Sequence, residues 1–369
     1  MKKPFEIDKL MAKSLTKQIC DGYRSAIADG RLAGDAKFPT CREICDLFGV
    51  SMIVSSAVVR QLGREGLIRS RPRTGSFVVP RDSTAWRGTV LFVNAGGTFS
   101  ANVGIIASTL RERLASSGFL FTSIDMPSRF IGKADVSRLT AALASRPKLV
   151  VLLHARPQAL AAVVKAGVDY IVLYGDAKSA SQKMPGACRG VISCDYRAVL
   201  SDFAAHCREV GVCSALEVGF AKDIHSAVPV LRRAGVEAST LKIRETPDFC
   251  FSGHVQRAGL AAAEKLLAKG KDALPDLVYF NDDYLAAGAL ISFARHGVRF
   301  PKDVRFVSLA TKGFEPVWWQ NLTRIEWDWF AQGEDIARRV IDLLESRAER
   351  IDAKMSPTYI IGDTFPESD

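Results

Sequence analysis

From residue 89 onward, short apolar runs alternate with stretches in which apolar residues recur every three to four positions. The runs predict strands at 89–93, 119–123, 149–153, 170–174, 191–193, 214–218, 277–280 and 304–309. Between them we expect helices that include 103–117, 136–144, 198–210 and 255–269. Alternation of strand and helix predicts parallel sheets built from right-handed crossovers. About 280 residues is too long for one such sheet, so we expect two lobes.

The first 80 residues follow a different pattern. A helical stripe at 14–29 ends at Gly30. Thr40 followed by Glu43 is typical of a capping box, and Ser51 can cap a third helix that stops near Gly66. Two short strands are expected at 67–69 and 76–79. Together these elements predict a winged helix-turn-helix domain at 1–80, a linker at 81–88 and a second domain at 89–369.

The positive charge is concentrated in the first domain. The chain carries a net charge of +10, and residues 1–80 hold 14 basic and 8 acidic side chains, or +6 of that total. Five arginines and one acidic residue occur between Arg60 and Arg73. A basic run is often only a solvated surface, but here it lies on the expected wing. We therefore predict that this domain binds DNA, a polyanion.

Four motifs in this domain resemble the GntR family of bacterial transcription factors. They are PTCRE at 39–43, GVSMIVSS at 49–56, LGREGL at 62–67 and GSFV at 75–78. The resemblance implies that Arg42 and Ser51 contact double-stranded operator DNA and that Gly75 lies close to it. The wing adds Arg71, Arg73 and Thr74 to the expected DNA-binding residues.

The recognition helix departs from that family. Met52, Val54 and Ser56 stand where the family has arginine, threonine and arginine. Base readout is then left to the hydroxyls of Ser55 and Ser56, to apolar contact of Met52 or Ile53 with thymine methyl groups, or to the wing arginines.

Ligands of parallel α/β sheets bind at the carboxyl ends of the strands. Aromatic, hydroxyl, carboxylate and amide side chains follow the predicted strands, and such a set suits a polyhydroxylated ligand such as a sugar. The candidates at these ends are Phe99, Ser100, His154, Tyr174, Asp195 and Asp282.

Three stretches of the second domain resemble the effector domains of the LacI family, at 275–290, 297–304 and 322–327. The resemblance implies a two-lobed, type 1 periplasmic-binding-protein-like fold of parallel Rossmann-like sheets, so the fold class is α/β. It also implies ligand contacts from Asp282, from Asp195 with Arg197, and from Trp327. Lys222 is the nearest match to a family arginine, and Phe249 completes the candidate set.

Structural explanations compete with these site assignments. Asp195 and Asp282 are each placed to cap a following helix. His154 can be a structural histidine at a strand end. The aromatic pairs at 318–319 and 327–329 can equally well pack in the hinge or in a dimer interface.

Several other classes of protein are disfavoured. The sequence has no dinucleotide-binding glycine motif, no phosphate-binding loop with lysine and no nucleophile elbow. His206, Cys207 and Cys213 lack zinc-ligand spacing. We expect neither an enzyme nor a cofactor. The apolar runs are too short to span a membrane, and no Cys-x-x-Cys pair occurs, so we expect a cytoplasmic protein that does not bind membranes.

The pairing of these domains resembles regulators of the arabinose-repressor type of Bacillus. We therefore expect a ligand-responsive transcriptional regulator, a homodimeric repressor of a carbohydrate-related operon, whose effector is a sugar. The alternative is a sugar sensor whose basic domain binds DNA only non-specifically.

Overall fold

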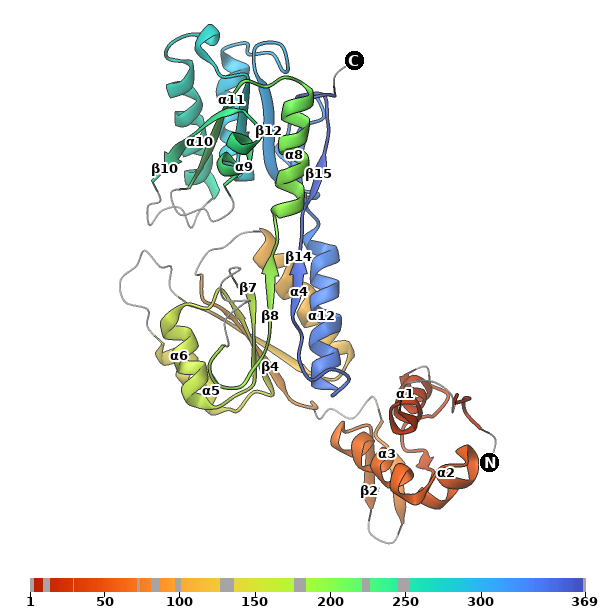
Figure 1. Cartoon of the computed structure of the whole chain (residues 1–369). Helices are drawn as coiled ribbons and strands as arrows, with labels where there is room; N and C mark the ends of the chain where they lie inside the picture. Colours follow the sequence, from red (N-terminus) through yellow and green to blue (C-terminus); the bar gives the residue numbers. More distant parts are fainter. Residues whose placement is uncertain are drawn as a thin grey trace. The chain divides into compact units, whose positions relative to one another are not determined.

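The computed structural model describes residues 3–8, 14–28, 30–71, 74–80, 86–96, 101–126, 136–175, 184–220, 226–244 and 252–367. Its elements are labelled in Figure 1. The chain divides into two compact units. The first consists of Met1–Thr89 with Ser116–Leu120, and the second of Val90–Ala115 with Phe121–Asp369.

The first unit contains the predicted winged helix-turn-helix. Its elements are α1 (Leu15–Ala28), β1 (Lys37–Phe38), α2 (Cys41–Phe48), α3 (Met52–Arg64), β2 (Ile68–Arg71) and β3 (Gly75–Val78). The strands form an antiparallel sheet in the order β1-β3-β2. Each helix contributes a buried apolar stripe, and these stripes meet in one core that includes Tyr23, Phe48 and Leu62.

A buried ion pair joins α1 to the end of α3. Arg24 is 8% exposed, and its Nε and Nη2 donate to the Glu65 carboxylate at 2.9 and 2.5 Å. Arg24 also pairs with Asp21. The bidentate geometry satisfies both buried charges, so the pair sets how the first helix lies against the recognition helix.

The second unit contains two lobes, each with a six-stranded sheet. We call the first the N-lobe, and its strand order is β14-β8-β7-β6-β4-β5. Its strands are β4 (Thr89–Asn94), β5 (Leu120–Asp125), β6 (Leu149–Leu153), β7 (Tyr170–Gly175), β8 (Cys188–Cys194) and β14 (Ala353–Met355). Its helices are α4 (Ala101–Ser116), α5 (Ser137–Ala144), α6 (Pro157–Ala166) and α12 (Trp329–Leu344).

We call the other lobe the C-lobe, and its strand order is β10-β9-β11-β12-β13-β15. Its strands are β9 (Ser214–Phe220), β10 (Glu237–Ile243), β11 (Leu277–Phe280), β12 (Arg305–Thr311), β13 (Thr323–Trp327) and β15 (Thr358–Ile360). Only the pairing of β15 with β13 is antiparallel among the described pairings of this sheet. Its helices are α8 (Arg197–Glu209), α9 (Val228–Arg233), α10 (Ser252–Leu267) and α11 (Asp283–Arg295), with a short 3-10 helix, η2 (Lys271–Ala273).

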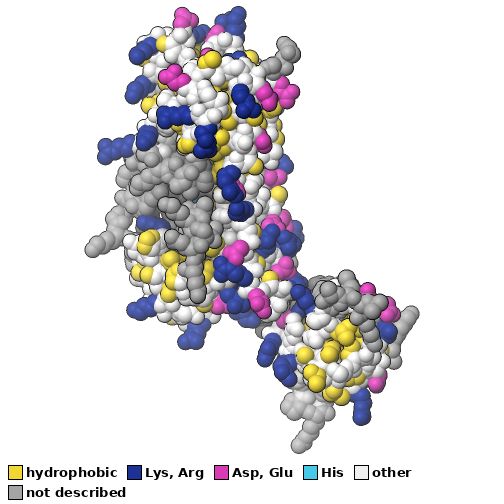
Figure 2. Space-filling model, viewed as in Figure 1, with side chains coloured by type: hydrophobic (Ala, Val, Ile, Leu, Met, Phe, Trp, Pro, Cys, Tyr) yellow, Lys and Arg dark blue, Asp and Glu magenta, His cyan; other side chains and the backbone are white. Residues whose placement is uncertain are grey.

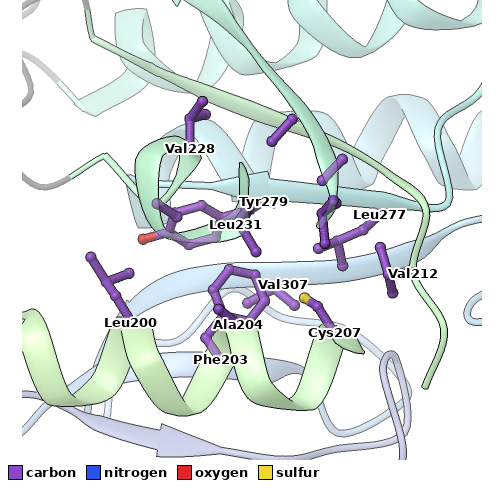
Figure 3. Close-up of a cluster of buried hydrophobic side chains, with 14 of the residues drawn as sticks. Leu200, Phe203, Ala204, Cys207, Val212, Val228, Leu231, Leu277, Tyr279 and Val307 are labelled. Carbon is purple, nitrogen blue, oxygen red and sulfur yellow. The ribbon is translucent and has the colours of Figure 1, made fainter. Parts of the chain in front are cut away.

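Helices cover both faces of the C-lobe sheet. On one face, α8 and α9 pack Phe203 and Leu231 against Tyr279 and neighbouring strand residues (Figure 3). On the other face, α10 and α11 approach each other closely because glycines line their contact. A Cβ atom at Gly288 would lie 1.8 Å from the carbonyl oxygen of Gln256, so no larger residue fits there.

Three segments cross between the lobes: from β8 to α8, from β13 to α12 and from β14 to β15. Each crossing leaves the carboxyl end of its strand. The carboxyl edges of the two sheets therefore both lie on the interlobe side (Figure 1). This is the α/β, two-lobed architecture that we predicted, and it brings the predicted ligand-binding strand ends to one region.

Candidate DNA-binding and effector-binding sites

The helix-turn-helix is fixed by the two predicted caps. Thr40 Oγ1 accepts from Glu43 N at 3.3 Å, and the Glu43 carboxylate accepts from Thr40 N at 2.7 Å. The hydrogen bonds that Thr40 N and the Thr40 hydroxyl donate to the Glu43 carboxylate hold the pKa of Glu43 below its usual range. Ser51 Oγ accepts from Val54 N at 3.4 Å and starts α3. Gly49, at φ 62°, makes the left-handed turn between the two helices.

The recognition helix α3 presents an apolar first turn. Met52 is 52% exposed and Ile53 is 82% exposed, whereas Ser55 is fully buried. The Ser55 hydroxyl donates to the carbonyl oxygen of Met52 at 3.1 Å. Ser55 therefore differs from our expectation of a DNA contact, because its side chain faces the core, and we leave it out of the DNA-binding surface. Ser56 is half-buried.

The wing is the hairpin of β2 and β3. Arg71 pairs with Gly75 across it, and the Arg71 guanidinium lies 4.7 Å from the ring centroid of Phe77. The Nη2 atom of Arg71 is 3.6 Å from Asp35 Oδ1. Phe77 and Asp35 therefore hold the Arg71 side chain in place, while 47% of it stays exposed. Gly75 adopts φ 108°, which favours glycine. Arg42, Arg69 and Thr74 are exposed as well, and Arg73 lies outside the described residues.

At the carboxyl edge of the N-lobe, His154 and Tyr174 lie together. Both adopt left-handed backbone, at φ 57° and 56°, and their ring centroids are 5.3 Å apart. His154 lies over Gly96, where an added Cβ would come within 2.7 Å of its ring. Tyr174 also contacts the ring of Trp329 at 5.4 Å. Phe99 and Ser100 fall outside the described residues.

At the carboxyl edge of the C-lobe, two neighbouring aspartates have different roles. Asp282 caps α11, because its Oδ1 accepts from Leu285 N at 2.9 Å. Asp283 reaches Thr311 at the end of the adjacent strand β12 through hydrogen bonds, and burial raises the pKa of its carboxyl group. The sequence predicted a ligand contact at Asp282 and none at Asp283. The sequence already indicated that Asp282 could cap the helix. A carboxylate used as a cap is bound to the helix backbone, so the next residue, Asp283, is the one whose side chain can reach the neighbouring strand end.

The first crossing carries the Asp195–Arg197 pair. Arg197 Nε and Nη2 donate to Asp195 at 2.9 and 2.6 Å, and Lys354 Nζ lies 3.5 Å from the same carboxylate. The Arg197 hydrogen bond holds the pKa of Asp195 well below its usual range. Arg197 itself is 79% exposed at the start of α8. The pair therefore offers a fixed carboxylate and a guanidinium open to solvent beside the interlobe region.

Trp327 is placed differently from a ligand-facing side chain. It is 1% exposed and stacks on Trp329 with ring centroids 4.4 Å apart and planes at 9°. Its indole donates to the Tyr196 hydroxyl. In this arrangement Trp327 packs in the hinge, which was the structural alternative. Lys222 and Phe249 lie outside the described residues.

No group of three or more His, Cys, Asp or Glu side chains in the described part of the chain could hold a metal ion. None of the described helices combines the length and the apolar character needed to cross a membrane.

Comparison with protein-family models matches two separate segments of the chain. Residues 15–78 match the model for bacterial regulatory proteins of the gntR family, and residues 204–365 match a periplasmic binding protein-like domain. None of the curated proteins compared matches the chain.

Solved structures of transcriptional regulators, the first of them a LacI-family protein, share the fold of the second unit. A regulator from Arthrobacter sp. FB24 in complex with lactose is 16% identical, with TM-score 0.58 over 76% of this chain and 100% of that one. A regulator from Yersinia pestis biovar Microtus is 16% identical, with TM-score 0.59 over 76% and 99%. The CelR–cellobiose complex is 17% identical, with TM-score 0.56 over 89% and 100%. The chain therefore carries a winged helix-turn-helix domain that matches bacterial regulatory proteins of the gntR family, and a periplasmic-binding-protein-like domain whose fold it shares with solved LacI-family regulators.

Proposed function

We propose that this regulator binds operator DNA as a homodimer and that a neutral sugar between the lobes changes its affinity for that DNA. In this proposal it acts in the cytoplasm as a repressor of a carbohydrate-related operon. One observation carries the proposal. The same chain has an exposed basic wing in its first unit and, in its second unit, two sheets whose carboxyl edges both lie on the interlobe side. This pairing of domains resembles regulators of the arabinose-repressor type of Bacillus.

The side chains at the two edges favour a neutral polyol. Rings of His154 and Tyr174 can pack against the apolar face of a sugar, and the carboxylate of Asp283 can accept from its hydroxyls. Among the described residues, several basic side chains located there already have partners: Arg197 and Lys354 pair with Asp195, Lys312 pairs with Asp328, and Arg156 donates to the carbonyl of Ala95. A phosphorylated ligand would compete for these cations. Two structural relatives were solved with disaccharides, lactose and cellobiose.

Thermodynamic coupling between the two binding sites explains how a sugar would change DNA affinity. A sugar that binds one arrangement of the lobes better than another shifts the population toward that arrangement. If that arrangement holds the two winged domains of a dimer at a different spacing, operator affinity changes by the same coupling factor. A two-fold dimer would read a palindromic operator with half-sites about one helical turn or more apart. The segment at 80–88 would transmit the change to the winged domains.

A thermal-shift screen of the full chain against sugars, sugar phosphates and nucleosides tests the ligand. We expect stabilisation by a neutral sugar, lost in Asp283→Asn and kept in Asp272→Asn, an exposed aspartate on η2. Stabilisation by phosphorylated compounds alone would contradict the neutral ligand.

The second candidate is a sugar sensor whose basic domain binds DNA without specificity. The apolar first turn of α3 motivates it, because that turn carries no arginine or asparagine to read a base. Footprinting of the full chain upstream of its own gene separates the two. A discrete footprint that disappears in the Arg42→Ala, Arg71→Ala double variant supports the regulator. Only salt-labile, uniform protection supports the sensor.

A further inference from the structure

The recognition helix α3 exposes two large apolar side chains in its first turn. Ile53 is 82% exposed and Met52 is 52% exposed, in consecutive positions of the first turn. The opposite side of the same helix buries Ser55, Val58 and Leu62 in the core. The apolar first turn therefore lies on the outer side of α3, away from the core.

The serine hydroxyl groups near this turn form hydrogen bonds within the domain. Ser51 Oγ accepts from Val54 N as the helix cap. Ser55 Oγ donates to Met52 O, and Cys45 Sγ donates to Ser55 Oγ at 3.3 Å. Ser56 Oγ is 3.8 Å from Cys41 Sγ, the geometry of a weak hydrogen bond. From Met52 to Val59 no residue other than Ser55 and Ser56 carries a side chain that can donate a hydrogen bond.

The surroundings of the apolar turn are basic. Arg60 and Arg64 lie further along the outer side of α3, and Arg42, Arg69 and Arg71 are exposed on α2 and the wing. Figure 2 shows apolar and basic side chains side by side at the surface of the small unit. An apolar pair framed by arginines is complementary to a polyanion that exposes apolar groups between its phosphates.

We infer that Met52 and Ile53 read the C5-methyl groups of thymines in the major groove, so that α3 selects its operator by methyl contact and not by hydrogen bonds to base edges. The thymine methyl is the apolar feature of the major-groove code. The inference rests on the proposed function and specifies the DNA chemistry that the recognition helix takes. Burial of one methyl group corresponds to about a fourfold change in affinity.

Selection from a random duplex library tests it with the full chain. The same library is amplified with thymidine or with deoxyuridine, which differs from thymidine only by the absent methyl group. We expect enrichment of a discrete sequence from the thymidine library and none from the deoxyuridine library. Equal enrichment from both would overturn the methyl-reading inference and leave the regulator intact. Enrichment from neither would overturn the proposed function and the inference with it.

Single replacements in the selected duplex locate the contacts. We expect about a fourfold loss of affinity for each contacted thymine changed to uracil. A Met52→Ala, Ile53→Ala variant should bind the thymidine duplex more weakly and no longer distinguish it from the uracil duplex. Ile291→Ala, which removes a side chain 52% exposed on α11, serves as the matched control and should retain the discrimination. Undiminished discrimination by the double variant would overturn the inference.

Discussion

The indole Nε1 of Trp327 donates a hydrogen bond of 2.8 Å to the hydroxyl oxygen of Tyr196. These residues belong to two different crossings between the lobes, and their ring centroids are 5.4 Å apart. Tyr196 directly precedes α8, and Trp327 ends β13. The bond thus ties together two of the three segments that connect the lobes.

Removing one partner of this bond should destabilise the effector domain. In Tyr196→Phe the buried indole N–H loses its acceptor, at a cost of about 1–3 kcal/mol in the free energy of unfolding. Chemical denaturation of Tyr196→Phe, Trp327→Phe and the double variant forms a complete cycle. We expect a coupling energy of about 0.5–3 kcal/mol. Strictly additive effects would show that the two side chains act independently.

Arg71 should contribute to DNA affinity as a phosphate contact. Its side chain is anchored over Phe77 and remains half exposed. We expect Arg71→Ala to weaken binding to all sequences by a similar factor. The slope of log affinity against log salt should fall by about 0.9. Titrations of the operator and of an unrelated duplex at several salt concentrations measure both effects. A loss confined to the operator, with an unchanged salt slope, would instead identify Arg71 as a base-reading residue.

The buried pair of Arg24 and Glu65 should be required for the fold of the winged domain. Glu65→Gln removes the buried carboxylate that pairs with Arg24 and leaves only the part-exposed Asp21 as its counter-charge, at a cost of up to about 3–5 kcal/mol. Denaturation followed by circular dichroism should show early loss of the small domain. Glu6→Gln is the matched control, because Glu6 pairs with Lys3 while 81% exposed, and it should leave the transition unchanged. Equal stability of the two variants would refute the structural role of the pair.

His206 should make the stability of the C-lobe depend on pH. Burial lowers the pKa of His206 below its usual range; its Nε2 donates to Pro366 O at 3.2 Å and its Nδ1 accepts from Tyr359. Because the unfolded chain takes up the proton first, at a pKa of about 6.5, stability is present above that pH and is lost as the pH falls below it. Unfolding free energies of the native chain and of His206→Gln across this window provide the check. The slope should be smaller in the variant.

Much of the fold follows from local patterns. The run at 149–153 has every residue buried, and its strand, β6, has the predicted bounds. The strand β10 was not predicted because it lies at the sheet edge and mixes exposed with buried residues. The strands β14 and β15 have three residues each. Three residues are too few to show a periodic pattern of apolar residues, so these strands were not predicted.

The sites were predictable only in part, because residue type does not determine which way a side chain points. Helical periodicity places Ser55 in line with Val58 and Leu62, so its burial could have been read from the sequence. The packing of Trp327 against Tyr196 could not, because it depends on two crossings 131 positions apart. Asp283 was overlooked because the neighbouring Asp282 satisfies the same pattern.

In the proposed function, a small molecule bound by the effector domain sets the affinity of the winged domain for its operator. Fluorescence anisotropy measures it directly, with full-length protein titrated onto a labelled selected operator at fixed salt, with and without a sugar that stabilises the protein. We expect the sugar to change the Kd by about 5- to 150-fold, and the Asp283→Asn variant to lose that change while still binding the operator. An unchanged Kd in the presence of a saturating, stabilising sugar would contradict the account.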